Sequence, residues 1–375
     1  MDRKCDRRKF IQATSLGATG LALGGLVQSP GPAWGYVARD EINPNISNLR
    51  VAYVHDDAMT NGTGPVSGWA NQNAVTNEAV VAANMDKMAC ALARRTDVGE
   101  AWRTIFIKPA AKQWNQVVVA IKTNNLGVQH THNAVMKKMC EVLVNHRGIT
   151  ASNIHIYDGV TGSTMGTETP WYGLPSGTRV EGAWGPRSSW ISVNVPPPYN
   201  QSATCVAAIA NGVPDILINI AMCKGHSSNV GGFTMCLKNH YGTFDPAPGH
   251  SGSDYILSIN KTPEILGPMD GLTGRITTPR QQLCFVDALW ASEAWDPSVQ
   301  PSDRPNRLFM GTFGPVLDYQ VATKFRRDTM GWSINGTVAN RFLTDFGYTA
   351  ADVPAMVDAM AWGQSDADRR WERYE

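Results

Sequence analysis

The sequence predicts an α/β fold of mostly parallel sheets that contain βαβ units. The strand expected at residues 116–122 is continuously apolar between its ends, which is typical of parallel strands buried on both faces. A helical pattern separates it from the next strand, at residues 153–158, and a crossover helix is what joins two parallel strands. We expect two α/β lobes, with the site at the carboxyl ends of the strands, where open α/β sheets bind ligands.

The composition is that of a globular protein. Of the 375 residues, 43% are hydrophobic and 17% are charged, and 33 Lys+Arg against 32 Asp+Glu leave a formal charge of +1. This apolar content excludes disorder as the default state. The balanced charge argues against a nucleic-acid-binding surface.

The segment 1–33 resembles a twin-arginine signal peptide. Arg7 and Arg8 precede a weakly apolar, Gly/Ala-rich run at residues 15–27, and Gly31-Pro32-Ala33 is a candidate cleavage site. We therefore expect recognition by the twin-arginine export machinery and a periplasmic or extracellular location. No later stretch approaches the ~20 apolar residues of a transmembrane helix, so we expect no transmembrane anchor after signal removal.

Six cysteines follow the expected signal peptide. They form no Cys-x-x-Cys motif, so an iron–sulfur cluster is not expected. Twin-arginine export carries folded cargo, which favours a metal ion or a metal-containing organic cofactor of unknown identity. The even number permits disulfides, but apolar surroundings favour buried free thiols. These cysteines are Cys90, Cys140, Cys205, Cys223, Cys236 and Cys284.

The expected N-terminal lobe covers residues 34–164. Its expected elements, from periodicity and terminal signals, are a strand at 48–55, a helix at 77–95, a strand at 116–122, a helix at 132–146 and a strand at 153–158. Polar residues follow two of the strands: Lys122, Asn124 and Asn125 after one, and Asp158 after another. Loops are commonly polar, but a lysine that ends an apolar run is harder to explain that way. We therefore expect these four residues to bind a ligand.

Residues 165–201 are rich in Gly, Pro, Trp and Ser and have weak periodicity. They predict an irregular insertion that could hold a hairpin and form a lid or rim. The expected C-terminal lobe, with a helical tail, covers residues 202–375. Its expected elements are strands at 213–222, 282–290 and 307–310, a helix that starts at 317–325, and helical pieces in the last forty residues.

The densest group of chemically active residues follows the strand at 213–222. Lys224 and His226 come directly after it, and Lys238, Asn239 and His240 end a short helical stretch. Two lysines and two histidines that converge suit an anionic group or a metal. A single histidine is ordinarily a structural residue, but the whole cluster favours a site.

The expected roles within this cluster follow from its residue types. We expect His226 to act as an acid or base, and Lys224 and Lys238 to act as electrostatic clamps or an anchor. The remaining candidates are the ligand-binding residues Gly231, Gly232, Asn239 and Asp287, and the metal ligands His240 and His250. Asp287 and Asp318 are candidate counter-charges for the lysines, or else caps or turn residues.

These segments resemble the family called domain of unknown function 362. The resemblance depends on the strand that ends in Ile121-Lys122-Thr-Asn124, on residues 153–159, on the Lys224-Gly-His226 and Lys238-Asn-His-Tyr-Gly242 motifs, and on residues 286–288. It covers roughly residues 48–345. Many relatives carry an added ferredoxin-like segment with Cys-rich cluster motifs, which this sequence does not have. Electron transfer through such clusters is therefore not expected.

A more distant resemblance is to the nickel-pincer lactate racemase family, in which a similar βαβ succession precedes His, Gly-Gly and Lys. It implies His226 as a base, Lys238 as the carrier of a covalently attached nickel–pincer nucleotide, and His250 as a metal ligand. Residues 122–125 replace that family's acidic-x-x-Arg motif, and residues 158–163 replace its Gly-x-His-Arg loop. One of the two bases and the substrate-binding arginine are thereby lost, which argues against racemisation.

Two classes of function remain open. An exported enzyme would bind a metal, or an anionic cofactor or substrate, at the Lys/His cluster and carry out redox or isomerase-type chemistry. A non-catalytic binding or assembly protein would use the cluster as a buried polar network, and Trp171, Trp184 or Trp190 would contact a partner. The sequence contains no phosphate-binding loop, Gly-x-Ser-x-Gly elbow or His-Glu-x-x-His helix.

Overall fold

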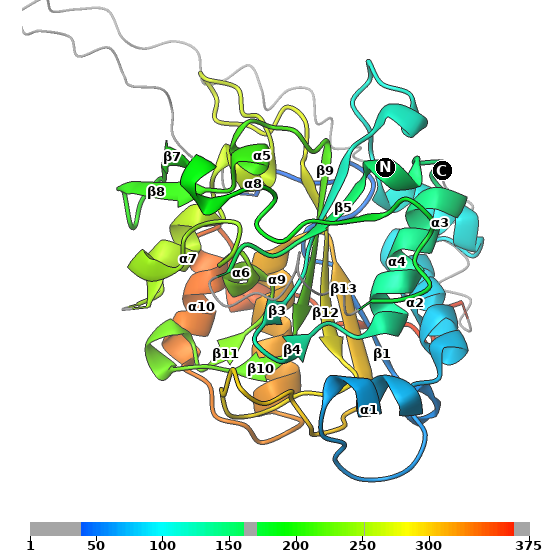
Figure 1. Ribbon diagram of the computed structural model, residues 1–375. Coiled ribbons are helices and arrows are strands. Elements are labelled where there is room, and N and C mark those ends of the chain that lie inside the picture. The colour runs from blue at the N-terminus through cyan, green and yellow to red at the C-terminus, as the bar shows by residue number, and fades with distance from the viewer. Residues whose placement is uncertain (1–38, 161–170, 251, 364–375) are drawn as a thin grey trace, which may run out of the picture. The chain divides into compact units, whose positions relative to one another are not determined.

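The computed structural model describes residues 39–160, 171–250 and 252–363 (Figure 1). All of these residues lie within one compact unit, Ala33–Glu375. The predicted signal peptide at 1–33 lies outside the described residues, so export stays a prediction. No helix in the described ranges has the length and apolar character needed to cross a bilayer.

The fold is built around one eight-stranded sheet of order β14-β1-β13-β12-β9-β2-β5-β6 (Figure 1). Its strands are β1 (Val51–His55), β2 (Val119–Lys122), β5 (Ile154–Tyr157), β6 (Arg179–Val180), β9 (Ile216–Met222), β12 (Gln281–Ala288), β13 (Arg307–Gly311) and β14 (Val357–Asp358). Neighbouring strands are parallel except at β13, which is antiparallel to β1 and β12. The predicted α/β class and its mostly parallel sheet are therefore confirmed.

The sheet takes strands from both of the expected lobes. β1, β2 and β5 come from residues 34–164, whereas β9, β12 and β13 come from residues 202–375. β9 pairs with both β2 and β12, and all seven of its residues are buried. An apolar strand with two buried faces can occupy the centre of a sheet. Since β9 joins β2 to β12, the two ranges share one sheet rather than forming a sheet each.

Helices cover both faces of the sheet (Figure 1). They are α1 (Trp69–Val75), α2 (Glu78–Ala93), α3 (Val98–Ile105), α4 (Asn133–Asn145), α5 (Ala207–Ala210), α6 (Cys236–Asn239), α7 (Asp254–Ile259), α8 (Pro263–Leu266), α9 (Gly314–Gln320) and α10 (Gly336–Thr344). One core contains Ile218 of β9 with side chains of α2, α3 and α4, and the other contains Leu217 with side chains of α6, α7, α9 and α10. Alternation along the strand therefore divides the buried apolar residues between two layers.

Local signals explain several helix boundaries. The Asn77 side chain accepts the N–H of Val80 and caps α2, and Gly148 follows α4 with a φ of +70°. The helix expected from residue 317 instead begins at Gly314, because Pro315 suits a first helical turn. It continues as the π-helical segment Val321–Arg327. The last forty residues contain α10, but also β14, which the sequence analysis missed.

The described part of the insertion, residues 171–201, contributes the first strand of a hairpin whose second strand follows the insertion. Its strand β7 (Ile191–Asn194) pairs with β8 (Ser202–Cys205). The tryptophans of this segment pack within the fold: Trp171 is buried and donates its indole N–H to the Thr131 carbonyl, and the Trp184 ring stacks on His155 at 4.4 Å. Trp190 is partly buried against the core. The hypothesis of a binding or assembly protein expects these three tryptophans to contact a partner. In the structure they pack inside the fold instead.

The six cysteines expected in the mature chain are all buried, and none forms a disulfide in the described structure. Each lies among apolar side chains of one of the two cores. These cysteines are therefore buried free thiols, as their apolar surroundings in the sequence predict.

Candidate functional site

A pocket of about 420 Å³ lies beyond the carboxyl ends of β2 and β9. Two short hairpins, which follow these strands, carry part of its lining: β3 (Asn125–Leu126) with β4 (Gln129–His130), and β10 (Lys224–Gly225) with β11 (Phe233–Thr234). The predicted site residues in its lining are Asn124, Asp158, Lys224, His226, Lys238, Asn239 and His250. Parallel strands thus bring residues that are distant in sequence to one edge of the sheet.

Lys122 does not line the pocket, but it forms a buried ion pair with Asp158, which does. Its Nζ is 3.1 Å from Asp158 Oδ1 and donates to Asn239 Oδ1 at 3.3 Å. Burial lowers the pKa of Lys122, and the Asp158 charge opposes this shift. Gly242, with a φ of +113°, lies so close to Asp158 that a Cβ would collide with the carboxylate. The glycine of the Lys-Asn-x-x-Gly motif therefore lets the chain approach this ion pair.

Two other lysines, Lys224 and Lys238, line the pocket. Lys224 is buried, and its ammonium donates to the Gln129 side-chain oxygen. Burial, followed by repulsion from Lys238, lowers the pKa of Lys224 to about 7. Lys238 is partly buried, and burial, followed by repulsion from Lys122, lowers its pKa to about 7. Neither lysine forms an ion pair with a carboxylate of the described residues.

Two histidines lie at the same pocket. The His226 ring centre is 5.0 Å from that of Trp295, and its Nδ1 is 2.9 Å from Ser227 Oγ. Burial, followed by the charges of Lys238, His250 and Lys224, lowers the pKa of His226 to about 3. The pKa of His250 is lowered by burial and then by Lys238. His226 is therefore a neutral imidazole near pH 7 when the pocket holds no anion.

The electrostatics of the pocket favour an anion. Its two carboxylates are Asp158, which already pairs with Lys122, and Asp245. The Thr234 hydroxyl also lines the pocket, and it is buried with no hydrogen-bond partner in the described part of the chain. Unbalanced cations and an unpartnered hydroxyl leave interactions that a bound anion would satisfy.

An apolar wall lies beside these polar groups, and the sequence analysis did not predict it. Its members are Leu126, Val160, Tyr241, Trp295 and Pro297. Trp295 and Pro297 belong to the loop after β12, where 45% of the Trp295 surface is exposed. Their position after a predicted strand was the available signal for them, because loops at that edge of the sheet line ligand sites.

Long-range hydrogen bonds hold the loop that carries Trp295. The Gln129 side-chain NH₂ donates to the Asp296 carbonyl at 2.6 Å and to the Val299 carbonyl at 3.0 Å. From the π-helical segment, the buried Arg326 donates to the Ser292 carbonyl at 2.9 Å. The side-chain oxygen of Gln129 accepts a hydrogen bond from the Lys224 ammonium. One glutamine therefore joins Lys224 to the loop that carries Trp295.

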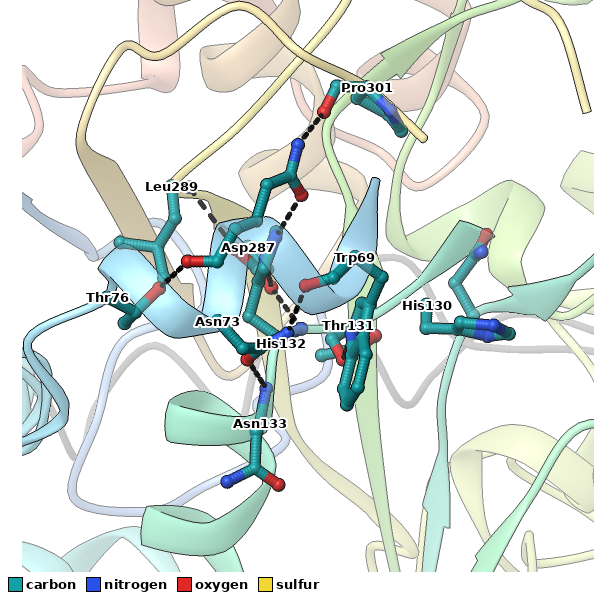
Figure 2. Close-up of polar contacts among 12 residues, drawn as sticks. Trp69, Asn73, Thr76, His130, Thr131, His132, Asn133, Asp287, Leu289 and Pro301 are labelled. Atoms are coloured by element: carbon teal, nitrogen blue, oxygen red, sulfur yellow. Dashed lines mark hydrogen bonds and ion pairs between the residues drawn. The ribbon is translucent and has the colours of Figure 1, made fainter. Parts of the chain in front are cut away.

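Asp287 does not reach the pocket, which corrects the prediction that it binds the ligand or balances the lysines. Alternation along β12 places Asp287 on the side of Phe285, in the core under α2 and α4. There its Oδ2 lies 2.7 Å from His132 Nδ1, and both side chains are fully buried. Figure 2 shows the two residues beside Asn73 of α1 and Thr76, which follows that helix.

Both ring nitrogens of His132 have a close partner. Gln72 donates its NH₂ to the carbonyls of Val66 and Pro301, so its oxygen faces His132 Nε2 at 2.8 Å. The Asp287 carboxylate faces Nδ1. His132 and Asp287 therefore form a buried pair whose polar atoms are satisfied inside the protein.

His240 is also engaged inside the protein. Its Nε2 is 2.7 Å from Gln281 Oε1 and its Nδ1 is 3.0 Å from Thr243 Oγ1, and burial lowers its pKa to about 3. Of the two predicted metal ligands, only His250 lines the pocket. In the described ranges, no three or more His, Cys, Asp or Glu side chains are placed to hold a metal ion.

Asp318 and the remaining predicted ligand-binding residues have structural positions. Asp318 accepts the N–H groups of Cys236 and Leu237 at 2.9 and 2.7 Å. It thus caps α6, and its pKa is raised to about 7 by burial. The backbone N–H of Asn125 donates to Asp158. Gly231 and Gly232 form a turn with φ values of +113° and +78° and do not line this pocket.

The pocket lies within the part of the chain that matches a family model. The family model described as Domain of unknown function (DUF362) matches residues 117–323, which is more than half of the chain. Every residue that lines the pocket lies within this range. No curated protein and no solved structure matches the chain, and the distant racemase resemblance stays a prediction.

Proposed function

Because the chain belongs to the family called domain of unknown function 362, whose description assigns no activity, we propose a function from the pocket itself. The pocket binds a small organic anion, either a substrate or an organic cofactor. The observation that carries this proposal is that Lys224 and Lys238 face one pocket and neither forms an ion pair within the described structure. An anion between them would supply the missing counter-charge.

The energetics favour a ligand over a structural role for these lysines. An ammonium group taken out of water without a counter-charge destabilises a fold by several kcal/mol. Lys122 is compensated by the Asp158 carboxylate, whereas no carboxylate of the described residues pairs with Lys224 or Lys238, and burial lowers the pKa of each. A bound anion would reverse this destabilisation, and the apolar wall would strengthen the attraction by excluding water.

Each group in the pocket has a role in this proposal. Lys224 and Lys238 bind the anionic group, and the Thr234 hydroxyl donates to it. Trp295 and Tyr241 contact the carbon skeleton of the ligand. His226 becomes more basic once a negative charge lies beside it, so it could transfer a proton to or from the ligand.

Calorimetric titration with carboxylates, phosphates and their neutral amides tests the proposal. We expect at least one anion to bind, its neutral analogue to bind far more weakly, and Lys224→Met and Lys238→Met each to lower the affinity at least about tenfold. The matched control is Lys324→Met, because Lys324 is exposed and pairs with Asp328. Equal binding of anion and amide, or affinities unchanged by both pocket variants, would refute the proposal.

Export through the twin-arginine pathway is a separate proposal that depends on residues 1–33 alone. The adjacent arginines are the feature that the export machinery reads. We expect a chain with Arg7→Lys and Arg8→Lys to accumulate uncleaved in the cytoplasm, while the unchanged chain is recovered outside it, beginning near Trp34. Fractionation with N-terminal sequencing measures both outcomes. Efficient export of the double variant would contradict the proposal.

A further inference from the structure

Lys238 differs from Lys122 and Lys224 in its surroundings. Lys122 has a carboxylate partner, and Lys224 donates to Gln129. No hydrogen bond or ion pair reaches Lys238 Nζ from the described residues, and this nitrogen lies 4.3 Å from the centre of the Tyr241 ring. The amine therefore faces the pocket without a competing acceptor.

The surroundings of Lys238 also favour the neutral amine. A lysine becomes a nucleophile when an apolar environment or a neighbouring cation removes its proton. Both are present here, since burial and the Lys122 charge bring the pKa of Lys238 to about 7. In the pocket without a bound anion, roughly half of the molecules would then carry a free amine at neutral pH.

We propose that Lys238 forms an imine with the carbonyl carbon of a 2-oxo acid bound in the pocket. This inference rests on the proposed function, because it takes the anion to be the carboxylate of the same molecule. Lys224 would bind the carboxylate, and the adjacent carbonyl would then lie toward Lys238. The volume of about 420 Å³ and the wall of Trp295 and Pro297 suit a small acid with an apolar side chain.

The reaction is balanced without an oxidant or a reductant. The amine lone pair attacks the carbonyl carbon, a C–N bond forms, and the carbonyl oxygen becomes a hydroxyl. This hydroxyl then leaves as water while nitrogen forms the C=N bond. The Lys238 ammonium carries three protons at the start. Two of them leave in the water molecule, and the third stays on the iminium nitrogen. His226 lines the same pocket as a neutral imidazole and is the group we expect to relay these protons.

Reductive trapping on the full chain tests the inference. The protein is incubated with pyruvate and sodium cyanoborohydride, which converts an imine into a stable secondary amine, and the site is found by peptide mass spectrometry. We expect Lys238 to be modified at least tenfold more than the exposed Lys324, with which it competes in the same sample. Lys238→Arg, which keeps the positive charge, should still bind pyruvate but lose the adduct.

Titration with lactate, the 2-hydroxy acid that corresponds to pyruvate, separates the two proposals. If both acids bind in a lysine-dependent way and no adduct forms on Lys238, the imine is refuted and anion binding stands. If neither acid binds, and no other anion does, the proposed function fails as well. Adducts that favour Lys224, or that persist in Lys238→Arg, would likewise overturn the assignment of Lys238.

Discussion

Replacing Asp287 with alanine should destabilise the protein by about 3–5 kcal/mol, as expected when one partner of a buried ion pair is removed. The His132 ring would lose the carboxylate 2.7 Å away, in a place where neither side chain has contact with water. The backbone N–H groups of His132 and Leu289 would also lose their acceptor. Urea denaturation, followed by tryptophan fluorescence, measures the change in the free energy of unfolding.

Two further variants make this result interpretable. Asp287→Asn keeps an oxygen acceptor but removes the charge. We therefore expect it to lower the free energy of unfolding, but by less than Asp287→Ala does. Asp328→Ala is the control, because its ion pairs with Lys324 and Arg327 are partly exposed and should contribute less than about 1 kcal/mol. A loss for Asp287→Ala no larger than that for Asp328→Ala would contradict a buried ion pair.

The sequence predicted the part of the site that depends on strand ends. Lys122 ends a buried apolar strand, Asp158 follows β5, and Lys224 follows β9. The carboxyl ends of parallel strands meet at one edge of a sheet, so finding the strands was enough to group these residues. Lys238 and Asn239 were found as a motif near the end of a short helix, α6.

Asp287 shows where reasoning from strand ends alone stops. Position along a strand gives the edge of the sheet, but the face depends on alternation, and a shift of one residue reverses the face. Val286 and Asp287 lie next to each other near the end of β12, yet Val286 belongs to the core on the side of α6 and α9. Assigning the face required the register of the whole sheet.

Other differences arise from contacts between distant segments. Gln129 and Arg326 hold the loop of Trp295 at the pocket. The position of this loop after a strand can be read from the sequence, but these two long-range contacts cannot. By contrast, the antiparallel direction of β13 had a readable signal. Residues 289–306, between β12 and β13, contain no helix in the structure, and parallel neighbours ordinarily need a helical crossover.

Replacing Lys238 with methionine should stabilise the unliganded protein by about 1–3 kcal/mol. Methionine occupies a similar volume without a charge, so the variant removes the unpaired ammonium and its repulsion of Lys224. The gain is reduced by the lost contact between the ammonium and the Tyr241 ring, 4.3 Å apart. A binding site that holds unbalanced charge for a ligand is expected to lower stability in this way.

The effect should depend on pH in a defined direction. Lys238 has a pKa of about 7 in the folded protein, against an ordinary value of 10.5. Between these values the unfolded chain binds the extra proton, so this lysine makes the wild type more stable as pH rises. Below pH 7 both states are protonated and the destabilisation is complete. The advantage of Lys238→Met should therefore be largest at or below pH 7 and shrink toward pH 10.

The thermal stability of Lys238→Met shows whether Lys224 and Lys238 serve a ligand, as proposed, or the fold. The variant is compared with the wild type at pH 7 without added ligand, with Lys324→Met as the control for removal of an exposed lysine. The account predicts a higher Tm for Lys238→Met and an almost unchanged Tm for Lys324→Met. A lower Tm for Lys238→Met would contradict it, because Lys238 would then belong to a network that holds the structure together.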